Sequence, residues 1–129
     1  MFDICLNLSN SQFKRDRLTM LSRARAAGVT DVLAVGTDLE SSAFCLDWAQ
    51  KMCSDETPVC HPTAGVHPHD TESIDTMGWA RLRDLASQPE VVAVGETGLD
   101  FNRNFPAKDA QHSAFERQIE LACEISKPL

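Results

Sequence analysis

The sequence predicts an α/β protein built on a parallel β-sheet. Short apolar segments alternate with longer amphipathic segments four times along the chain, which is the pattern of consecutive strand–helix units. Two apolar segments, 32–35 and 91–94, contain no alternating polar residues, as expected for strands that are covered on both faces. Strands joined by helices run parallel, with right-handed crossovers. The length of 129 residues suits a single domain, 1–129.

The first two units are expected at 2–53. A strand at 2–8 is followed by a helix within 11–28, where Gly28 provides a stop. A second strand at 29–37 leads into a helix at 38–53, and Asp38 is a suitable N-cap because its carboxylate can accept a hydrogen bond from the first turn. The apolar face expected for this helix consists of Leu39, Ala43, Leu46 and Ala49 or Cys53.

The third and fourth units are expected at 58–127. The strand at 58–66 has a weak β signal because it contains two prolines, and a helix is expected at 74–87. The strand at 90–96 is clearer and precedes a long helix at 106–127. The apolar stripe expected on this last helix consists of Phe115, Ile119, Ala122 and Ile125.

Composition and charge restrict the classes of function. The hydrophobic fraction of 43% and the charged fraction of 24% are typical of a globular protein. No apolar run approaches the roughly 18 residues that a transmembrane helix needs, and the start of the chain lacks a signal-peptide pattern. The five scattered cysteines include no C-x-x-C pair and are expected to be reduced thiols in a cytoplasmic protein.

The net charge of −7 argues against a module that binds nucleic acid through a basic surface, since phosphate contacts need clustered Lys and Arg. It does not exclude an enzyme that meets phosphate through a bound cation, because the cation inverts the local field.

Polar residues follow the expected strands where ligands usually bind. In parallel α/β sheets, ligands gather at the carboxyl ends of the strands. Glu96 comes directly after the apolar run at 91–94 and Gly95. The equivalent positions in the other units are Asn7, Thr37 or Asp38, and His67. The sequence therefore predicts that polar groups from several strands converge on one rim.

The residues alone leave the roles of Glu96 and the two histidines open. Glu96 suits a hard divalent cation or general-base chemistry, and it equally suits a solvated or helix-capping acid in a loop. His67 and His69 form an H-x-H pair that can bind a metal, but Pro68 interrupts the strand between them. The alternative is a surface loop with two histidines that take no part in chemistry.

Four further polar residues also have two interpretations each. Asp3 and Asn7 could both reach the mouth of the sheet, but a structural role for Asp3 as a buried hydrogen-bonding acid is favoured. Asp100 and Asn102 are either partners behind the site or turn-forming residues.

Three segments taken together resemble the TatD family of metal-dependent deoxyribonucleases, within the amidohydrolase-like superfamily. They are "FDICLNL" (2–8), "GVHPHD" (65–70) and "VGETGLDFNRNF" (94–105), and the similarity extends over the whole chain. The resemblance implies a TIM-barrel-like fold with a divalent-metal site at the carboxyl-end rim. It also implies hydrolysis of DNA phosphodiester bonds as a 3′-to-5′ exonuclease on single strands, with RNA as a further substrate.

The resemblance also implies roles for individual residues. Glu96 matches the family glutamate that binds and can bridge the metals, and His67 matches a histidine near the scissile phosphate. Asp3 matches the acid that opens the first motif. The implied cation is Mg²⁺, with Mn²⁺ or Zn²⁺ as alternatives. Many relatives carry an H-x-H pair where this chain has Cys5 and Asn7, although the TatD branch tends to have asparagine at the second position.

The chain is short for the implied fold, because a (β/α)8 barrel typically needs about 250 residues. The resemblance therefore predicts the N-terminal half of a barrel, with further metal ligands beyond Leu129 and little activity for the half alone. A related amidohydrolase that cleaves an amide, ester or lactone is an alternative. A second alternative is a non-catalytic half-barrel that self-associates through its exposed strand edges.

Overall fold

The structure, a computed structural model, describes residues 1–52, 54–103 and 105–129. Four parallel strands lie in the order β1-β2-β3-β4, so the α/β fold expected from the sequence is confirmed. The strands are β1 (Phe2–Leu6), β2 (Asp31–Ala34), β3 (Val59–Ala64) and β4 (Ala93–Val94). The helices are α1 (Arg17–Ala26), α2 (Leu39–Lys51), α3 (Thr76–Ala86) and α4 (Lys108–Ile125), with short 3-10 helices η1 (Ser11–Phe13) and η2 (Pro68–Asp70).

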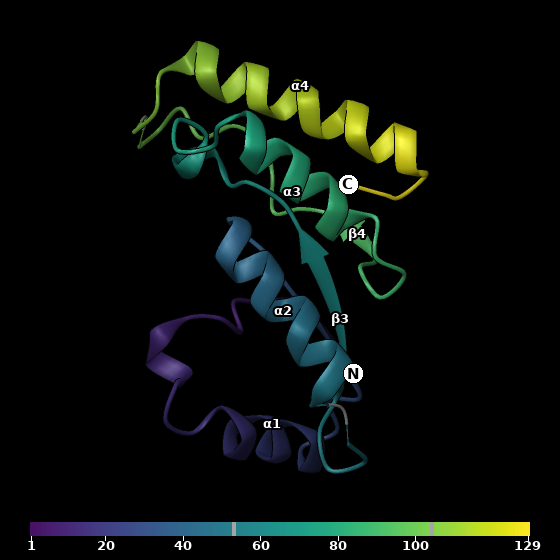
Figure 1. The fold of residues 1–129 in the computed structure, drawn as a ribbon. Coiled ribbons are helices and arrows are strands. Elements are labelled where there is room, and N and C mark those ends of the chain that lie inside the picture. Colours follow the sequence, from purple (N-terminus) through teal and green to yellow (C-terminus); the bar gives the residue numbers. More distant parts are fainter. Residues whose placement is uncertain (53, 104) are drawn as a thin grey trace.

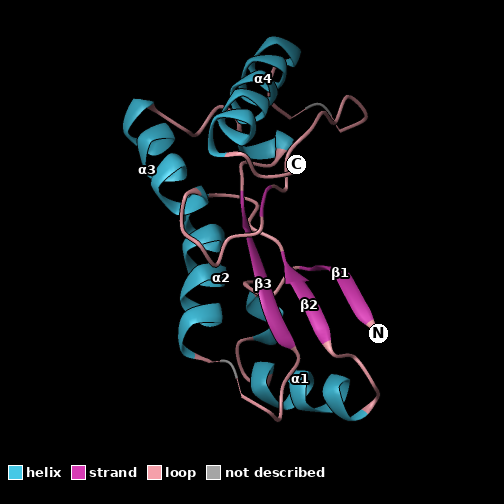
Figure 2. Cartoon of the chain, turned by 90° about the vertical axis from the view of Figure 1, so that its right-hand side faces the viewer, coloured by secondary structure: helices cyan, strands magenta, loops and turns pink. Residues whose placement is uncertain are grey.

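Helices α2 and α3 contact β3, and α4 contacts β4. Figure 1 shows α2 lying along β3, and α3 beside α4 at the far end of the molecule from α1. Figure 2 shows β1, β2 and β3 side by side, with β1 at the edge near the N-terminus. In the register of the sheet, Val32 of β2 lies opposite Asp3 on one side and Cys60 on the other.

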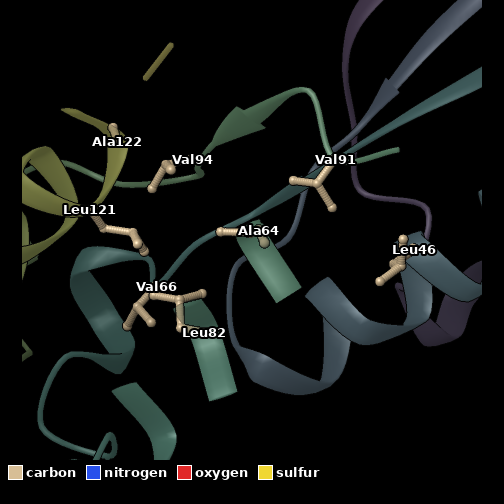
Figure 3. Close-up of a cluster of buried hydrophobic side chains, with 9 residues drawn as sticks. Leu46, Ala64, Val66, Leu82, Val91, Val94, Leu121 and Ala122 are labelled. Carbon is tan, nitrogen blue, oxygen red and sulfur yellow. The ribbon is translucent and has the colours of Figure 1, made fainter. Parts of the chain in front are cut away.

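Two clusters of buried side chains form the core. The first lies beneath α1 and α2 and consists of Leu8, Leu21, Val32, Ala34, Cys45 and Cys60. The second joins α2, α3 and α4 to β3 and β4 (Figure 3) and consists of Leu46, Ala64, Val66, Leu82, Ala86, Val91, Val94, Leu121 and Ala122. Within the part of the chain that the structure describes, no helix has both the length and the apolar character needed to cross a membrane.

Helix α2 begins as expected. Asp38 is its N-cap, with the side chain accepting a hydrogen bond from the Ser41 backbone N–H at 2.7 Å. The Ser41 hydroxyl in turn accepts from the Asp38 backbone N–H, which completes a capping box. Leu46 is buried on the predicted face, whereas Cys53 lies outside the described residues.

The face of the sheet opposite the core clusters is largely uncovered. Side chains alternate between the faces of a strand, so Val32 and Ala34 point towards the helices while Leu33 points away from them. An apolar groove on that opposite face is lined by Phe2, Ile4, Leu33, His61, Val92, Ala93 and Pro128. Val92 is 37% exposed, so the expectation that the run 91–94 is covered on both faces is wrong at this residue.

The buried face of α4 also differs from the predicted stripe. Ala122 is buried as predicted and Ile125 packs against the core, but Ile119 is 36% exposed, and the side chains of Gln111 and Gln118 are completely buried. The helix is therefore rotated relative to the simple apolar pattern. The physical reason is that both amides form hydrogen bonds to the backbone of neighbouring loops, which offsets the cost of burying them.

We predict that the 129-residue chain self-associates in solution. The apolar groove and the outer edge of β1 are exposed, and such surfaces favour association. Sedimentation velocity should show dimers or larger species for the wild type and a shift towards monomer for Ile4→Lys, since Ile4 is 71% exposed in the groove. Leu18→Lys, an exposed position on α1, is the matched control and should leave the distribution unchanged. A compact wild-type monomer would contradict the prediction.

Candidate active site

One buried side chain connects the carboxyl ends of three strands. The Thr63 hydroxyl, at the end of β3, accepts a hydrogen bond from the Gly36 backbone N–H at 3.1 Å and donates one to the Gly95 carbonyl at 2.6 Å. Gly36 follows β2 and Gly95 follows β4. Thr63 is 3% exposed, so both bonds are shielded from water and hold the strand ends together.

The strand ends approach so closely that two positions accommodate only glycine. A Cβ atom on Gly65 would lie 2.5 Å from the carbonyl carbon of Gly95, which is backbone and cannot move aside. A Cβ on Gly36 would lie 2.3 Å from the Ser42 hydroxyl oxygen. The glycines therefore permit the segments after β2, β3 and β4 to meet at one rim.

His67 and Glu96 lie side by side on this rim, as the strand–helix pattern predicted. The Glu96 backbone N–H donates to the Gly36 carbonyl at 2.5 Å, and the His67 N–H donates to the Thr37 carbonyl at 2.7 Å. With the backbone fixed in this way, Nε2 of His67 lies 3.9 Å from Oε1 of Glu96. The exposed fractions of the two side chains are 23% and 43%, so the carboxylate faces solvent beside a more enclosed imidazole.

The imidazole of His67 is oriented through its other nitrogen. Nδ1 of His67 accepts a hydrogen bond from the His69 backbone N–H at 3.2 Å, as His67 caps η2. An accepting Nδ1 carries no proton, so the neutral ring carries its proton on Nε2. His67 therefore presents an N–H donor to the space beside Glu96.

His69 belongs to a second pair behind His67. Its Nε2 is 2.6 Å from Oδ2 of Asp100, and its ring centroid is 4.4 Å from that of His67 in an edge-on arrangement. Oδ1 of Asp100 accepts from the backbone N–H groups of Asn102 and Arg103, each at 3.1 Å. Asp100 thus contacts His69, whereas Asn102 is exposed and contributes its backbone to the turn.

These hydrogen bonds favour the ionised form of Asp100. The bond from the Arg103 N–H, followed by the bond with His69, lowers the pKa of the Asp100 carboxyl to about 2. Asp100 is therefore a carboxylate throughout the neutral pH range.

Asp3 and Asn7 are not joined to this group. Oδ1 of Asp3 accepts from the Cys5 backbone N–H, and Oδ1 of Asn7 accepts from the Ser9 hydroxyl, each at 3.2 Å. Asp3 makes hydrogen bonds as expected but is exposed rather than buried. It lies opposite Val32 in the register, in the amino-terminal half of β1, whereas Asn7 follows the carboxyl end of the strand.

Sequence reasoning missed the residues that hold the rim in place. Thr63 lies in the segment expected to be a weak strand, and Gln111 and Gln118 are not part of the apolar stripe expected on the last helix. The one available signal was helical spacing, because 111, 114, 118, 121 and 122 share a face of α4. That face is the one buried in the structure.

The described side chains fit one part of a cation site. Glu96 offers a hard, exposed carboxylate oxygen of the kind that divalent cations prefer. In the tautomer described above, Nε2 of His67 carries a proton and is a hydrogen-bond donor rather than a ligand. Within 1–52, 54–103 and 105–129, no three His, Cys, Asp or Glu side chains are grouped to hold a metal. Glu96 would therefore be one ligand of a cation whose other positions are filled by water, by phosphate oxygens or by groups outside these residues.

A comparison with models of protein families shows which family the chain belongs to. The model of the family described as TatD related DNase matches residues 2–129. The chain belongs to this family. The resemblance in the three sequence segments is thereby confirmed, over almost the whole length of the chain.

Curated relatives carry the name 3′-5′ ssDNA/RNA exonuclease TatD. The relative from Cronobacter turicensis is 50% identical over 129 residues, which is 100% of this chain and 47% of the relative. The relative from Escherichia fergusonii is 46% identical and is covered to 48% of its length. The chain therefore spans about half the length of the curated relatives that it matches.

Solved structures agree with the fold. The crystal structure of YJJV, a TatD homolog from Escherichia coli K12, matches with a TM-score of 0.86 and 27% identity, covering 99% of this chain and 48% of that one. A TatD family hydrolase from Entamoeba histolytica matches with a TM-score of 0.87 and 25% identity, covering 96% of this chain and 46% of that one. The TIM-barrel-like arrangement expected from the resemblance is confirmed.

The ionisation of Asp100 predicts an acid-sensitive contribution to stability. Its folded pKa of about 2 lies below the ordinary value of 3.8, so the contribution is present above 3.8 and is lost as the pH falls towards 2. Urea unfolding at about pH 5 and about pH 2.5 should therefore show a smaller loss of stability on acidification for Asp100→Asn than for the wild type. Asp55→Asn, an exposed turn position, should retain the wild-type loss. Equal losses for all three proteins would show that Asp100 is not held as described.

Proposed function

We propose that the full gene product is a metal-dependent exonuclease that removes nucleotides from the 3′ end of single-stranded DNA or RNA. Residues 1–129 would be the N-terminal portion of its barrel and would supply one side of the active site. The observation that carries this proposal is the pairing of the Glu96 carboxylate with the Nε2 side of His67, 3.9 Å apart at the carboxyl ends of parallel strands. The name shared by relatives up to 50% identical supports the choice of substrate.

Glu96 and His67 have complementary roles in the proposed reaction. Glu96 would hold a divalent cation, most suitably Mg²⁺, with Mn²⁺ or Zn²⁺ compatible with the same oxygen ligand. A cation bound there supplies polarisation of a phosphoryl oxygen and a more acidic water molecule. His67 would donate its Nε2 proton to a phosphate oxygen or to the departing sugar oxygen, because that N–H faces the same space.

His69 and Asp100 would keep His67 in position. The His69 backbone N–H binds Nδ1 of His67, and Asp100 fixes the His69 ring. Because the pKa of the Asp100 carboxyl is lowered to about 2, its carboxylate stays ionised in the neutral range and can accept a hydrogen bond from His69. We assign these two residues to positioning rather than to contact with the reacting atoms.

Asn7 and Asn102 stay predictions, either as substrate contacts or as residues that support the site from behind. Both are exposed in segments that follow strands β1 and β4, where a nucleotide strand would pass the rim. Asp3 is farther from the rim by its register and is a weaker candidate.

The charge of the chain favours a cation as the phosphate-binding element. A net charge of −7 repels a nucleic acid at long range, so the surface as a whole does not recruit phosphate. A cation held by Glu96 would reverse the field locally. The proposal therefore predicts strict dependence on added metal.

The test is cleavage of a 5′-labelled single-stranded oligonucleotide by the full gene product. Glu96→Gln should lower the rate by at least about 100-fold, because the amide is a poorer metal ligand than the carboxylate. Glu116→Gln, an exposed position on α4, is the matched control and should keep full activity. A chelator should abolish cleavage, and added Mg²⁺ or Mn²⁺ should restore it.

Two outcomes would contradict the proposal. The first is metal-dependent cleavage that survives Glu96→Gln undiminished. The second is turnover of a cyclic amide or a lactone by an enzyme that leaves the oligonucleotide intact, which would indicate an amidohydrolase.

A further inference from the structure

Two buried glutamines on α4 have no role in the reaction described above. The side chains of Gln111 and Gln118 are 0% exposed, although a primary amide is costly to bury unless its donors and acceptor are satisfied. They lie two turns apart on the same face of the helix as the small buried residues Ala114 and Ala122. Their hydrogen-bond partners explain their burial.

Gln118 binds both polar groups of a single backbone residue. Its Oε1 accepts from the Val66 N–H at 2.8 Å, and its Nε2 donates to the Val66 carbonyl at 3.0 Å. A second hydrogen of Nε2 reaches the Ala114 carbonyl at 3.3 Å. Val66 directly precedes His67, so this clamp fixes the chain at the start of the loop that carries both rim histidines.

Gln111 makes equivalent hydrogen bonds to the backbone of the loop that carries Asp100. Its Oε1 accepts from the Asp100 N–H at 2.8 Å, and its Nε2 donates to the Asp100 carbonyl at 3.3 Å and to the Pro106 carbonyl at 3.1 Å. The side chain of Asp100 binds His69. Gln111 therefore holds Asp100 itself, and Gln118 holds the start of the loop that carries its partner His69.

Helix α4 is itself fixed by contacts away from the rim. Its Glu124 forms a two-pronged ion pair with Arg83 of α3. Leu121 points towards Val66 and Leu82 in the core (Figure 3). Just beyond the helix, the Val94 N–H donates to the carbonyl of Pro128 at 2.9 Å. The helix thus has a fixed position from which to hold both loops.

We propose that Gln111 and Gln118 are positioning residues that set the distance between the His67–His69 loop and the Asp100 loop. The spacing of the two amides along one rigid helix determines where Val66 and Asp100 lie. His67 then projects beside Glu96, and His69 meets Asp100. This inference goes beyond the proposed function, because it concerns how the rim is assembled.

A purely structural role gives different expectations. If the glutamines only contributed to stability, their replacement would raise amide hydrogen exchange throughout the protein. A positioning role confines the effect of each glutamine to the loop that it holds, and leaves the strands beneath α1 and α2 unchanged.

The experiment replaces each amide by a side chain of equal length that cannot form these hydrogen bonds. In the full gene product, Gln118→Met and Gln111→Met retain the length and bulk but remove the donors and the acceptor. Amide hydrogen exchange at Val66 should become about tenfold faster in Gln118→Met, and exchange at Asp100 should do so in Gln111→Met. Exchange at Val32 and Ala34 should not change.

Gln50→Met is the matched control, because Gln50 lies exposed on α2 and bonds only to the side chain of Glu90 among the contacts described. It should leave exchange in both loops unaltered. The positioning variants should lower kcat on single-stranded DNA by about tenfold with little change in KM, since a misplaced His67 weakens only the reacting state.

The wild type provides a measurement that does not depend on how well the variants fold. The side-chain amide protons of Gln111 and Gln118 should exchange much more slowly than those of Gln50. Equal exchange for all three side chains would overturn the proposal, as would variants in which exchange rises evenly through the strands. If the loop effects appear but the wild type cleaves no nucleic acid, the positioning role stands and the proposed nuclease function fails.

Discussion

The geometry of the rim depends on how closely the carboxyl ends of β2, β3 and β4 approach one another. The Thr63 hydroxyl bonds to the segments on either side of its own strand, and Gly65 leaves no room for a side chain against Gly95. Because these contacts are buried and involve backbone atoms, they cannot relax without moving a whole strand. The positions of His67 and Glu96 follow from this constraint, since each is anchored by a backbone hydrogen bond to the segment after β2.

Two kinds of support act on the same few side chains. The backbone after β2 holds His67 and Glu96 through hydrogen bonds. Helix α4 holds the loops that begin at Val66 and contain Asp100 through the side chains of Gln118 and Gln111. Polar groups in such an arrangement are effective in catalysis because they need little reorganisation when charge develops. Glu96 provides the exposed carboxylate beside His67, and the chain covers about half the length of its relatives.

The sequence predicted the parts of the structure that follow from periodicity. The alternation of apolar and amphipathic segments located the strands, and the rule for parallel sheets brought His67 and Glu96 to the same rim. The sequence did not predict burial correctly where a residue is buried by partners that are distant in the sequence. Gln118 is buried because the backbone of Val66 satisfies its amide, which hydropathy does not register. Val92 is exposed because the described residues leave one face of the sheet open.

Titration of the full gene product with Mn²⁺, followed through the ring proton signals of its histidines, tests most directly whether the rim is a cation site. The paramagnetic ion broadens signals steeply with proximity, so binding at Glu96 should broaden His67 first and His69 next, because these rings lie together. His61, which bonds to Asp31 at the amino-terminal end of β2, should stay sharp at the same concentration. Broadening of His61 before His67 would place the cation elsewhere and contradict the assignment of Glu96 as its ligand.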